Sequence, residues 1–437
     1  MSIVTHEIVR FSVDALQSAL IAKTFGNIFI MNLPRKPLFW SVSFGHAVND
    51  MFMSMGATIL TFMSGSLLHI GPHEIGIAEA LRQLVGSFSQ PVFGWFVDKT
   101  GGRWMGAGGV AWTVSFMLLG LLLAVTTGNF WLMMIPYSIA ALGSGAFHPA
   151  GALHSAEADK TRATSNLAWF FLFGQSGLAV GPAVAGGLIQ ISGSVIPIFA
   201  LGLLMIPAVI LMALHIPNKE TYQRSAPEKF ERKNDIQLRG LPWKSMLLLL
   251  VVVTLRSVAQ PGSGQFIPPL FAQKGWEPGS YGLITASFWL ASGFGGVFFG
   301  NLADRFDRRW IVALSLALCA PTFIFLPLVD GPLAFVLALA AGGLSGGSHS
   351  VIVTAAQELL PGSKAFASGA ILGIIFGMGA LGSLFIGTLA DATSLTTAFQ
   401  MVGIITFVAA ASAFLLPRSR AKAAVSPIVE TALEAGD

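Results

Sequence analysis

The chain of 437 residues is 54% apolar and only 11% charged, with a net charge of +4 and with 49 glycines and 22 prolines. An average soluble domain has roughly 25% charged residues, and one with so few could not cover this much apolar surface. The composition therefore excludes a disordered chain, a nucleic-acid-binding domain and a cytosolic enzyme. It is typical of a membrane protein that crosses the bilayer many times, in which glycine and proline are frequent within helices.

Cysteine and nucleotide-binding patterns narrow the function further. The single cysteine, Cys319, excludes an internal disulfide, and no cysteine or histidine cluster has the spacing of a zinc site. No G-x-x-x-x-G-K-[ST] loop for nucleotide phosphates occurs. We therefore expect no ATP, no metal and no other cofactor.

Residues 1–33 precede the first apolar stretch and are weakly amphipathic. Glu7 and Asp14, together with the lack of a cleavage site, argue against a signal peptide. Two interpretations stay open: a helix that lies on the membrane surface, or translation that begins at Met31.

Twelve apolar stretches follow, each of roughly 20 residues or more and so long enough to cross a bilayer as a helix. They are 38–62, 74–97, 104–126, 130–157, 163–191, 195–216, 243–270, 280–303, 309–329, 333–359, 365–391 and 395–416. A charged segment separates the sixth span from the seventh. The sequence thus predicts an N-terminal cytoplasmic segment 1–37, a six-helix bundle 38–216, a cytoplasmic linker 217–242, a second six-helix bundle 243–417 and a cytoplasmic tail 418–437.

The lysines and arginines are distributed unevenly between the two sides of this map. The segments on the side of the N-terminus hold 22 of the 25, and the opposite loops hold only Lys274. Arg82 and Arg256 fall within spans. Because cytoplasmic loops are enriched in lysine and arginine, we expect both termini and the linker to be cytoplasmic.

The two halves of the chain repeat one another. Gly145-Ala-Phe-His148 in the fourth span corresponds to Gly346-Gly-Ser-His349 in the tenth. The loop Gly94–Trp104 likewise corresponds to Gly300–Trp310. We therefore expect an all-α membrane protein with twelve transmembrane helices in two pseudo-symmetric six-helix bundles. This arrangement of two repeated bundles is typical of transporters, in which the substrate site lies between the halves near the middle of the bilayer.

Both of these loops resemble the G-x-x-x-D-R/K-x-G-R-R/K signature of the major facilitator superfamily. The fifth span also resembles the antiporter signature of its proton-driven exporters, with Gly177, Gly181, Pro182, Gly186 and Gly187, although three residues rather than two separate the proline from the glycine pair.

Two further motifs resemble the fosmidomycin-resistance group of bacterial exporters within that superfamily. They are His46-Ala-Val-Asn49-Asp50 in the first span and Gly145-Ala-Phe-His148-Pro149 in the fourth. This resemblance implies proton-driven export of a small anionic or amphipathic compound.

The resemblance also implies a conformational latch at the cytoplasmic loops, formed by Asp98 and Arg103 in the first loop and by Asp304 and Arg305 in the second. Arg103 is placed to bridge to Glu157 or Asp159 and so to hold an outward-open state. The alternative is a tight turn with solvated charges.

Asp50 and Arg256 are the charges that the map places deepest in the bilayer, about 18 and 20 Å from the starts of spans one and seven. A charge at mid-membrane costs at least roughly 2.5–3.5 kcal/mol, so such residues point to function. We interpret Asp50 as the proton-coupling site and Arg256 as its partner or as a substrate-anion site. A static ion pair between the two spans is the alternative.

Histidine and amide side chains surround these charges in the sequence. His46 lies one helical turn before Asp50 on the same face and can exchange protons near neutral pH. We expect a substrate cavity to be lined by Asn49, His148, Arg256, Gln260 and His349. Structural roles for the histidines stay open, and Glu79 and Arg82 are expected to form a structural pair along one helix.

The sequence therefore predicts a monomeric secondary transporter of the bacterial inner membrane that exports a small organic compound in exchange for protons. Its partners are the substrate, protons and the lipid bilayer, with no nucleic acid. A proton-coupled importer of an organic anion and a non-transporting sensor on the same fold are the alternatives. An intramembrane enzyme would need an acidic metal motif or a nucleophile constellation, which the sequence lacks.

Overall fold

The computed structural model describes residues 34–159, 161, 163–221, 243–303, 305–359 and 364–416. Several segments that the sequence analysis interpreted lie outside the described residues. They are residues 1–33, most of the linker 217–242, Asp304 and the tail 418–437.

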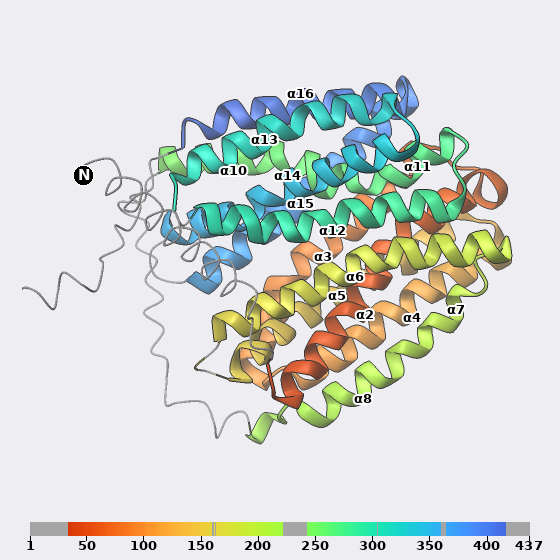
Figure 1. The fold of residues 1–437 in the computed structure, drawn as a ribbon. Coiled ribbons are helices and arrows are strands. Elements are labelled where there is room, and N and C mark those ends of the chain that lie inside the picture. The colour runs from red at the N-terminus through yellow and green to blue at the C-terminus, as the bar shows by residue number, and fades with distance from the viewer. Residues whose placement is uncertain are drawn as a thin grey trace, which may run out of the picture.

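The described chain is helical and its helices follow the predicted spans closely (Figure 1). The first bundle contains α2 (Pro37–Met63), α3 (Pro72–Thr100), α4 (Arg103–Thr127), α5 (Phe130–Glu157), α6 (Ala163–Ser192), α7 (Ile198–Leu201) and α8 (Met205–His215). The second contains α10 (Trp243–Ser257), α11 (Ile267–Gln273), α12 (Pro278–Ala303), α13 (Arg308–Phe325), α14 (Gly331–Leu359), α15 (Lys364–Ala392) and α16 (Leu395–Ala413). The predicted all-α fold with two six-helix bundles is confirmed.

Eleven helical segments of the described chain are long and apolar enough to cross a membrane. The predicted span that is not among these eleven is the second, 74–97, which forms α3. This helix has 29 residues but carries five charged residues, namely Glu74, Glu79, Arg82, Asp98 and Lys99. Its charges distinguish α3 from the other spans, and it is one of the helices at which the two bundles meet.

The seventh span is broken in its middle. α10 ends at Ser257, and a π-helical turn over Val258–Gly262 and a 3₁₀ turn over Ser263–Phe266 connect it to α11. Pro261 lacks the backbone N–H that a continuous α-helix would need at this point. Such π turns often occur at functional sites, and this one begins two residues after Arg256.

Small residues allow α2 and α6 to approach closely within the first bundle. A Cβ atom added at Gly177 would collide with the carbonyl oxygen of Ala47, and one at Gly181 with that of Met51. Close backbone approach of this kind is a principal source of helix association in lipid, where no hydrophobic effect drives the helices together. The glycines of the fifth span therefore fix α6 against the helix that carries Asp50.

The two bundles meet along two helix pairs, α3 with α15 and α6 with α12. A Cβ added at Gly76 would lie 2.8 Å from the carbonyl oxygen of Ser383, and His73 Nδ1 lies 3.1 Å from Thr388 Oγ1. On the other pair, Gly279 N donates to Gln190 Oε1 at 3.0 Å. These contacts lie near the beginning of α3 and the end of α6, at the end of the molecule where the helices of the two bundles converge in Figure 1.

The turn between α3 and α4 lies at the other end of the helices. Gly101 and Gly102 both have positive φ angles, 76° and 72°, which side-chain-bearing residues rarely adopt. His154 Nε2 lies 2.5 Å from the Gly101 carbonyl oxygen, so the end of α5 is joined to this turn.

Arg103 does not form the bridge to Glu157 or Asp159 that the sequence suggested. Its Nε donates at 2.7 Å to the carbonyl oxygen of Ile216, just beyond α8, and Glu157 lies 3.7 Å from His154 Nδ1. The last carbonyls of a helix have no partner within the helix, so they attract a nearby guanidinium. Arg103 therefore connects two helices within the first bundle.

Candidate functional site

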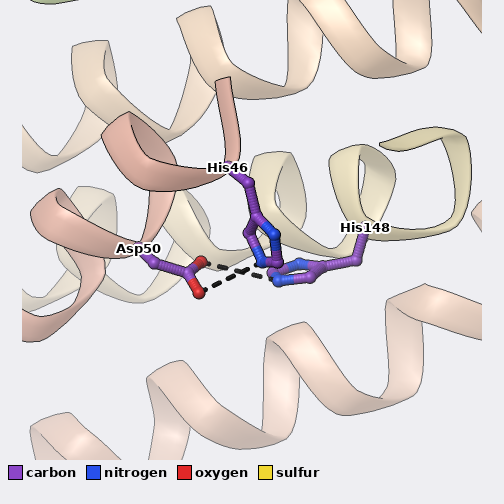
Figure 2. A group of neighbouring side chains, drawn as sticks. All are labelled: His46, Asp50 and His148. Atoms are coloured by element: carbon purple, nitrogen blue, oxygen red, sulfur yellow. Dashed lines mark ion pairs between the residues drawn. The ribbon is translucent and has the colours of Figure 1, made fainter. Parts of the chain in front are cut away.

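Asp50 lies in the middle of α2 and is only 8% exposed. Figure 2 shows two imidazole rings that point at its carboxylate, one from the preceding turn of α2 and one from α5. His46 Nε2 lies 3.3 Å from Oδ2, and His148 Nε2 lies 3.5 Å from Oδ1. The predicted proximity of His46 and Asp50 is confirmed, and the structure adds His148 to the same cluster.

Both rings are held in position by backbone carbonyl groups. His46 Nδ1 lies 2.8 Å from the carbonyl oxygen of Phe170 in α6, and His148 Nδ1 lies 2.8 Å from that of Ser144 in α5. A carbonyl oxygen can only accept a hydrogen bond, so each Nδ1 carries a hydrogen. Each Nε2 is thereby directed at Asp50.

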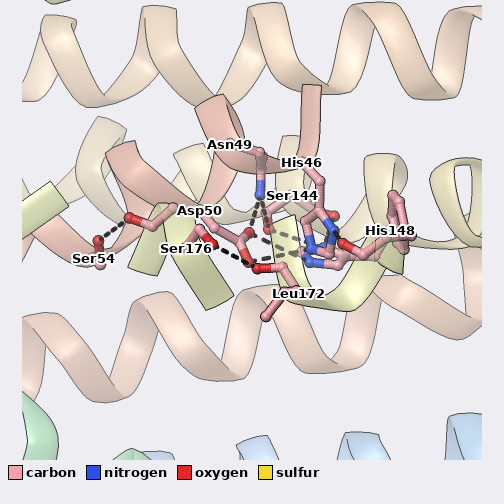
Figure 3. A network of polar contacts seen from close by, with 10 residues as sticks. His46, Asn49, Asp50, Ser54, Ser144, His148, Leu172 and Ser176 are labelled. Carbon is pink, nitrogen blue, oxygen red and sulfur yellow. Dashed lines mark hydrogen bonds and ion pairs between the residues drawn. The ribbon is translucent and has the colours of Figure 1, made fainter. Parts of the chain in front are cut away.

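Asn49 connects the carboxylate to α5. Its Nδ2 donates to Asp50 Oδ1 at 2.9 Å and to Ser144 Oγ at 3.0 Å, as Figure 3 shows. Asn49 itself is fully buried, and Ser144 is 6% exposed. The network thus joins α2, α5 and α6 through polar groups that lie away from solvent.

The surroundings of His46 are aromatic and tightly packed. Its ring stacks on Phe170 at a centroid distance of 4.0 Å and meets His148 edge-on at 5.0 Å. A Cβ atom at Gly174 would collide with the His46 ring. The absence of a side chain at Gly174 therefore allows His46 to lie against α6.

His46, Asp50 and His148 each offer one ligand atom within 4.8 Å of the others, the one such group found among the described residues. Imidazole nitrogens and a carboxylate are also the donors of many transition-metal sites. The contacts of 3.3 and 3.5 Å are nevertheless within the range of ion pairs between a protonated imidazole and a carboxylate, which need no metal ion between them.

Arg256 occupies a different environment in the second bundle. Its Nε donates to Ser348 Oγ at 2.9 Å, and its Nη2 donates to the Ser345 carbonyl oxygen at 3.0 Å and to Gln260 Oε1. The side chain is fully buried, and Nη1 has no hydrogen-bond partner among the described residues. In the described part of the chain, no carboxylate forms an ion pair with this guanidinium.

The ion pair between Asp50 and Arg256 that the sequence left open does not form in this structure. Asp50 has its partners on α2 and α5, and Arg256 has its partners on the seventh span and α14. Equal depth along two spans does not imply contact, because the repeat places equivalent residues in different bundles.

The remaining residues that the sequence assigned to a cavity lie close to Arg256. Gln260, 6% exposed, sits in the π-helical turn and donates through Nε2 to Ser292 Oγ of α12. His349 is half-buried on α14, next to Ser348, which accepts from Arg256. The structure therefore divides the predicted cavity residues into one group around Asp50 and another around Arg256.

Glu79 and Arg82 form the predicted pair within α3. Nε and Nη2 of Arg82 both donate to Glu79 Oε2, and the Tyr137 hydroxyl of α5 donates to Glu79 Oε1. All three residues are buried. This arrangement neutralises both charges locally and joins α3 to α5.

Two of the residues expected to form the latch are exposed at the ends of their helices, Asp98 on the last turn of α3 and Arg305 just after α12. Asp304 lies outside the described residues.

Three site residues were not identified from the sequence: Ser144, Phe170 and Gly174. Ser144 corresponds to Ser345 in the repeat; Ser144 is linked to Asp50 through Asn49, and Ser345 accepts from Arg256. This correspondence was available from the repeat, whereas the roles of the Phe170 carbonyl and of Gly174 depend on the approach of α6.

Comparison with known proteins supports this architecture. Residues 42–277 and 247–433 match the family model described as Major Facilitator Superfamily. The fosmidomycin resistance protein of Escherichia coli is 26% identical over 383 residues, which cover 87% of this chain and 93% of that protein. The uncharacterized MFS-type transporter YfnC of Bacillus subtilis is 27% identical over 388 residues, with the same two coverages.

Solved structures show the same fold. A bacterial homologue of the human lysosomal transporter Spinster, in an inward-facing and occupied conformation, has a TM-score of 0.66 at 14% identity. It covers 86% of this chain and 96% of its own. The nucleoside transporter NupG has a TM-score of 0.63 at 16% identity, with coverages of 87% and 98%.

Proposed function

Since the chain belongs to the Major Facilitator Superfamily and is therefore a multi-pass membrane transporter rather than an enzyme, we propose that it exports a small organic compound in exchange for protons. The observation that carries this proposal is the buried Asp50 carboxylate, contacted by two imidazole groups at the middle of a membrane-spanning helix. Ionisable groups in such positions mark proton relays in transporters.

Asp50 and His46 form the proton-coupling site in this proposal. Histidine changes its charge in the range between about pH 5 and 8, so the cluster can respond to a physiological proton gradient. Asn49 and Ser144 connect Asp50 to α5. A change in the charge of the cluster of His46, Asp50 and His148 therefore alters the attraction between α2 and α5, which gives the proton an effect on the conformation.

The substrate cavity in this proposal extends from Asn49 and His148 to Arg256, Gln260 and His349. Arg256 is buried without a carboxylate partner in the described part of the chain, and its Nη1 is unbonded. An anionic substrate group that reached Nη1 would remove the cost of this uncompensated charge.

Two observations favour export over import. The first is that the glycines of the fifth span resemble the antiporter signature of proton-driven exporters. In the structure, Gly186 lies against Pro278 and Gly282 of α12 where the bundles converge, and Gly177 and Gly181 allow α6 to pack closely on α2. The fosmidomycin resistance protein bears a name that suggests removal of a compound from the cell. Proton-coupled import of an organic anion is the second candidate, favoured by Arg256, whose Nη1 has no hydrogen-bond partner among the described residues.

Alternating access follows from a rocking motion of the two bundles about the substrate site, with the segment 217–242 as the connection between them. We place the protein in the bacterial inner membrane as a monomer, with both termini and this linker cytoplasmic. The contacts between bundles near His73 and Thr388 then close the outer side. Asp98, Arg103, Asp304 and Arg305 form the cytoplasmic latch of the opposite state.

Transport into everted membrane vesicles tests the proposal. Fosmidomycin and a panel of organic anions are offered as probes, with and without an imposed pH gradient. An antiporter accumulates its substrate when the vesicle interior is acidic, and collapse of the gradient stops the accumulation. Accumulation that needs the opposite gradient would establish the importer instead.

A further inference from the structure

The orientation of the two imidazole rings determines which of their nitrogens can exchange a proton. Nδ1 of His46 and Nδ1 of His148 each face a backbone carbonyl oxygen at 2.8 Å and are occupied as donors. Each Nε2 faces its own carboxylate oxygen, Oδ2 for His46 and Oδ1 for His148. Two simultaneous N–H···O contacts can therefore form to one carboxylate.

The number of protons on the two Nε2 atoms decides the charge of the cluster. With none, two nitrogen lone pairs would face an ionised carboxylate, and a buried negative charge would have no cation beside it. With one, the cluster is neutral, and with two it carries one positive charge. The geometry supports the states with one and two protons.

The two rings differ in their access to water. The His46 side chain is 3% exposed and is stacked on Phe170, whereas the His148 side chain is 27% exposed. A proton on His46 is therefore enclosed between Asp50 and α6, and a proton on His148 can be exchanged with the aqueous side.

We propose that the exchangeable proton is carried by Nε2 of His148, and that Asp50 and His46 remain a permanent ion pair that holds it there. This inference rests on the proposed function and assigns the proton to a residue that the sequence placed in the substrate cavity. In the loading step, a proton leaves a hydronium ion of the open side and forms an N–H bond at the His148 Nε2 lone pair. In the release step that bond breaks toward water of the other side, and the cluster returns to neutrality.

Among the described residues, the charged groups of the neighbouring helices are not placed to carry the exchangeable proton instead of His148. On α5, His154 lies in the last turn of the helix, where its Nε2 contacts the Gly101 carbonyl oxygen. On α3, Glu79 and Arg82 neutralise one another beside Tyr137. The part of α6 that contacts the cluster offers Phe170, Gly174 and Ser176, which carry no charge.

Nitrogen-15 NMR of histidine-labelled protein in lipid nanodiscs tests the assignment without any substrate. His148→Gln removes the exchanging group, and His215→Gln is the matched control. His215 also places Nδ1 2.8 Å from the carbonyl oxygen four residues earlier, that of Leu211, and within the described chain it pairs with no carboxylate.

We expect one buried imidazolium whose signal stays charged from about pH 5 to 8, and a second that titrates within this range. His148→Gln should lose the titrating signal and keep the constant one, and His215→Gln should keep both. A constant signal lost in His148→Gln, or a carboxyl of Asp50 that titrates while both rings stay neutral, would overturn the proposal. So would one equivalent of tightly bound transition metal in the purified protein, because the cluster would then be a metal site.

A transport measurement separates this inference from the proposed function. His148→Gln should lose uphill transport driven by a pH gradient, whereas the control His215→Gln should keep it. If the wild-type protein itself shows no gradient-driven transport, the proposed function fails, whatever the NMR titration gives. If the wild type is driven by the gradient and His148→Gln is driven equally, the assignment to His148 fails and the proposed function stands.

Discussion

Asp50 and Arg256 occupy equivalent positions in the two bundles and carry opposite charges. Positions 50 and 256 are the same number of residues apart as Asp98 and Asp304, which correspond to one another in the repeated loops. Equivalent serines lie near both charges: the Ser144 hydroxyl is connected to Asp50 through Asn49, and the Ser345 carbonyl oxygen accepts directly from Arg256.

This relationship gives the two halves of the repeat different chemistry on a common framework. In the first bundle an acid is surrounded by histidines that can take up protons, and in the second a base is surrounded by neutral hydrogen-bonding groups. We therefore propose that the proton binds in the first bundle and the anionic part of the substrate next to the second.

Replacement of Arg256 should affect anionic compounds selectively. We expect Arg256→Met to weaken binding of organic anions roughly 10- to 100-fold, as for the loss of a charged hydrogen bond worth about 1.5–3 kcal/mol. Arg256→Lys should recover only part of the affinity, because an ammonium lacks the planar fork of the guanidinium. Binding to the purified variants by calorimetry measures both effects. Equal loss for anionic and neutral compounds would indicate a structural role instead.

Glu79 and Arg82 should stabilise the fold as a unit. Glu79→Gln and Arg82→Met each leave one buried charge without its partner, so each should cost about 3–5 kcal/mol of unfolding free energy. The double variant should cost less than the sum of the two single variants, because it leaves no such charge. Tyr137→Phe removes one hydrogen bond to Glu79 and should cost about 1 kcal/mol. Unfolding in detergent checks these values, and additive losses for the two single variants would refute the coupling.

Gly186 and Gly187 provide a matched pair at the contact between bundles. A Cβ at Gly186 would collide with the Pro278 carbonyl oxygen of α12, whereas a Cβ at Gly187 would meet no described atom within 4 Å. Gly186→Val should therefore prevent closure at this end and favour the opposite state, and Gly187→Val should change little.

Cysteines at positions 73 and 388 report on that closure, because His73 and Thr388 lie in contact across the bundles. Buried Cys319 is first replaced by alanine to remove the background thiol. We expect the yield of the cross-link to fall in Gly186→Val and to stay constant in Gly187→Val. An unchanged yield in Gly186→Val would show that the close approach at Gly186 does not control the closed state.

The orientation in the membrane has a direct test. From the distribution of 22 of 25 lysines and arginines, a reporter enzyme fused after Lys233 should register the cytoplasm. A periplasmic signal from this fusion would reverse the map and the assignment of the latch side.

The fold was largely predictable from the sequence because its determinants are local. The span boundaries follow from runs of apolar residues, and the two bundles follow from the repeat of motifs such as Gly145–His148 and Gly346–His349. The helical spacing of His46 and Asp50 likewise predicted their contact, and the spacing of Glu79 and Arg82 predicted theirs.

Contacts between distant helices were not predictable in the same way. Depth along a span does not give the direction of a side chain, so Asp50 was matched with Arg256 although His148 lies beside it. Arg103 was matched with acidic residues of a nearby loop, while its partner is the Ile216 carbonyl oxygen at the end of α8. Backbone groups are potential partners at every position, and only the packing of the helices selects among them.

Gradient-driven transport by Asp50→Asn tests the central claim most directly. The variant and the wild-type protein are reconstituted in liposomes with matched orientation, and substrate accumulation under an imposed pH gradient is compared with exchange of labelled for unlabelled substrate. Because the amide cannot hold His46 and His148 in their charged forms, we expect accumulation to be abolished while binding and slow exchange persist. Full gradient-driven accumulation by Asp50→Asn would show that the proton is coupled elsewhere and would contradict the account.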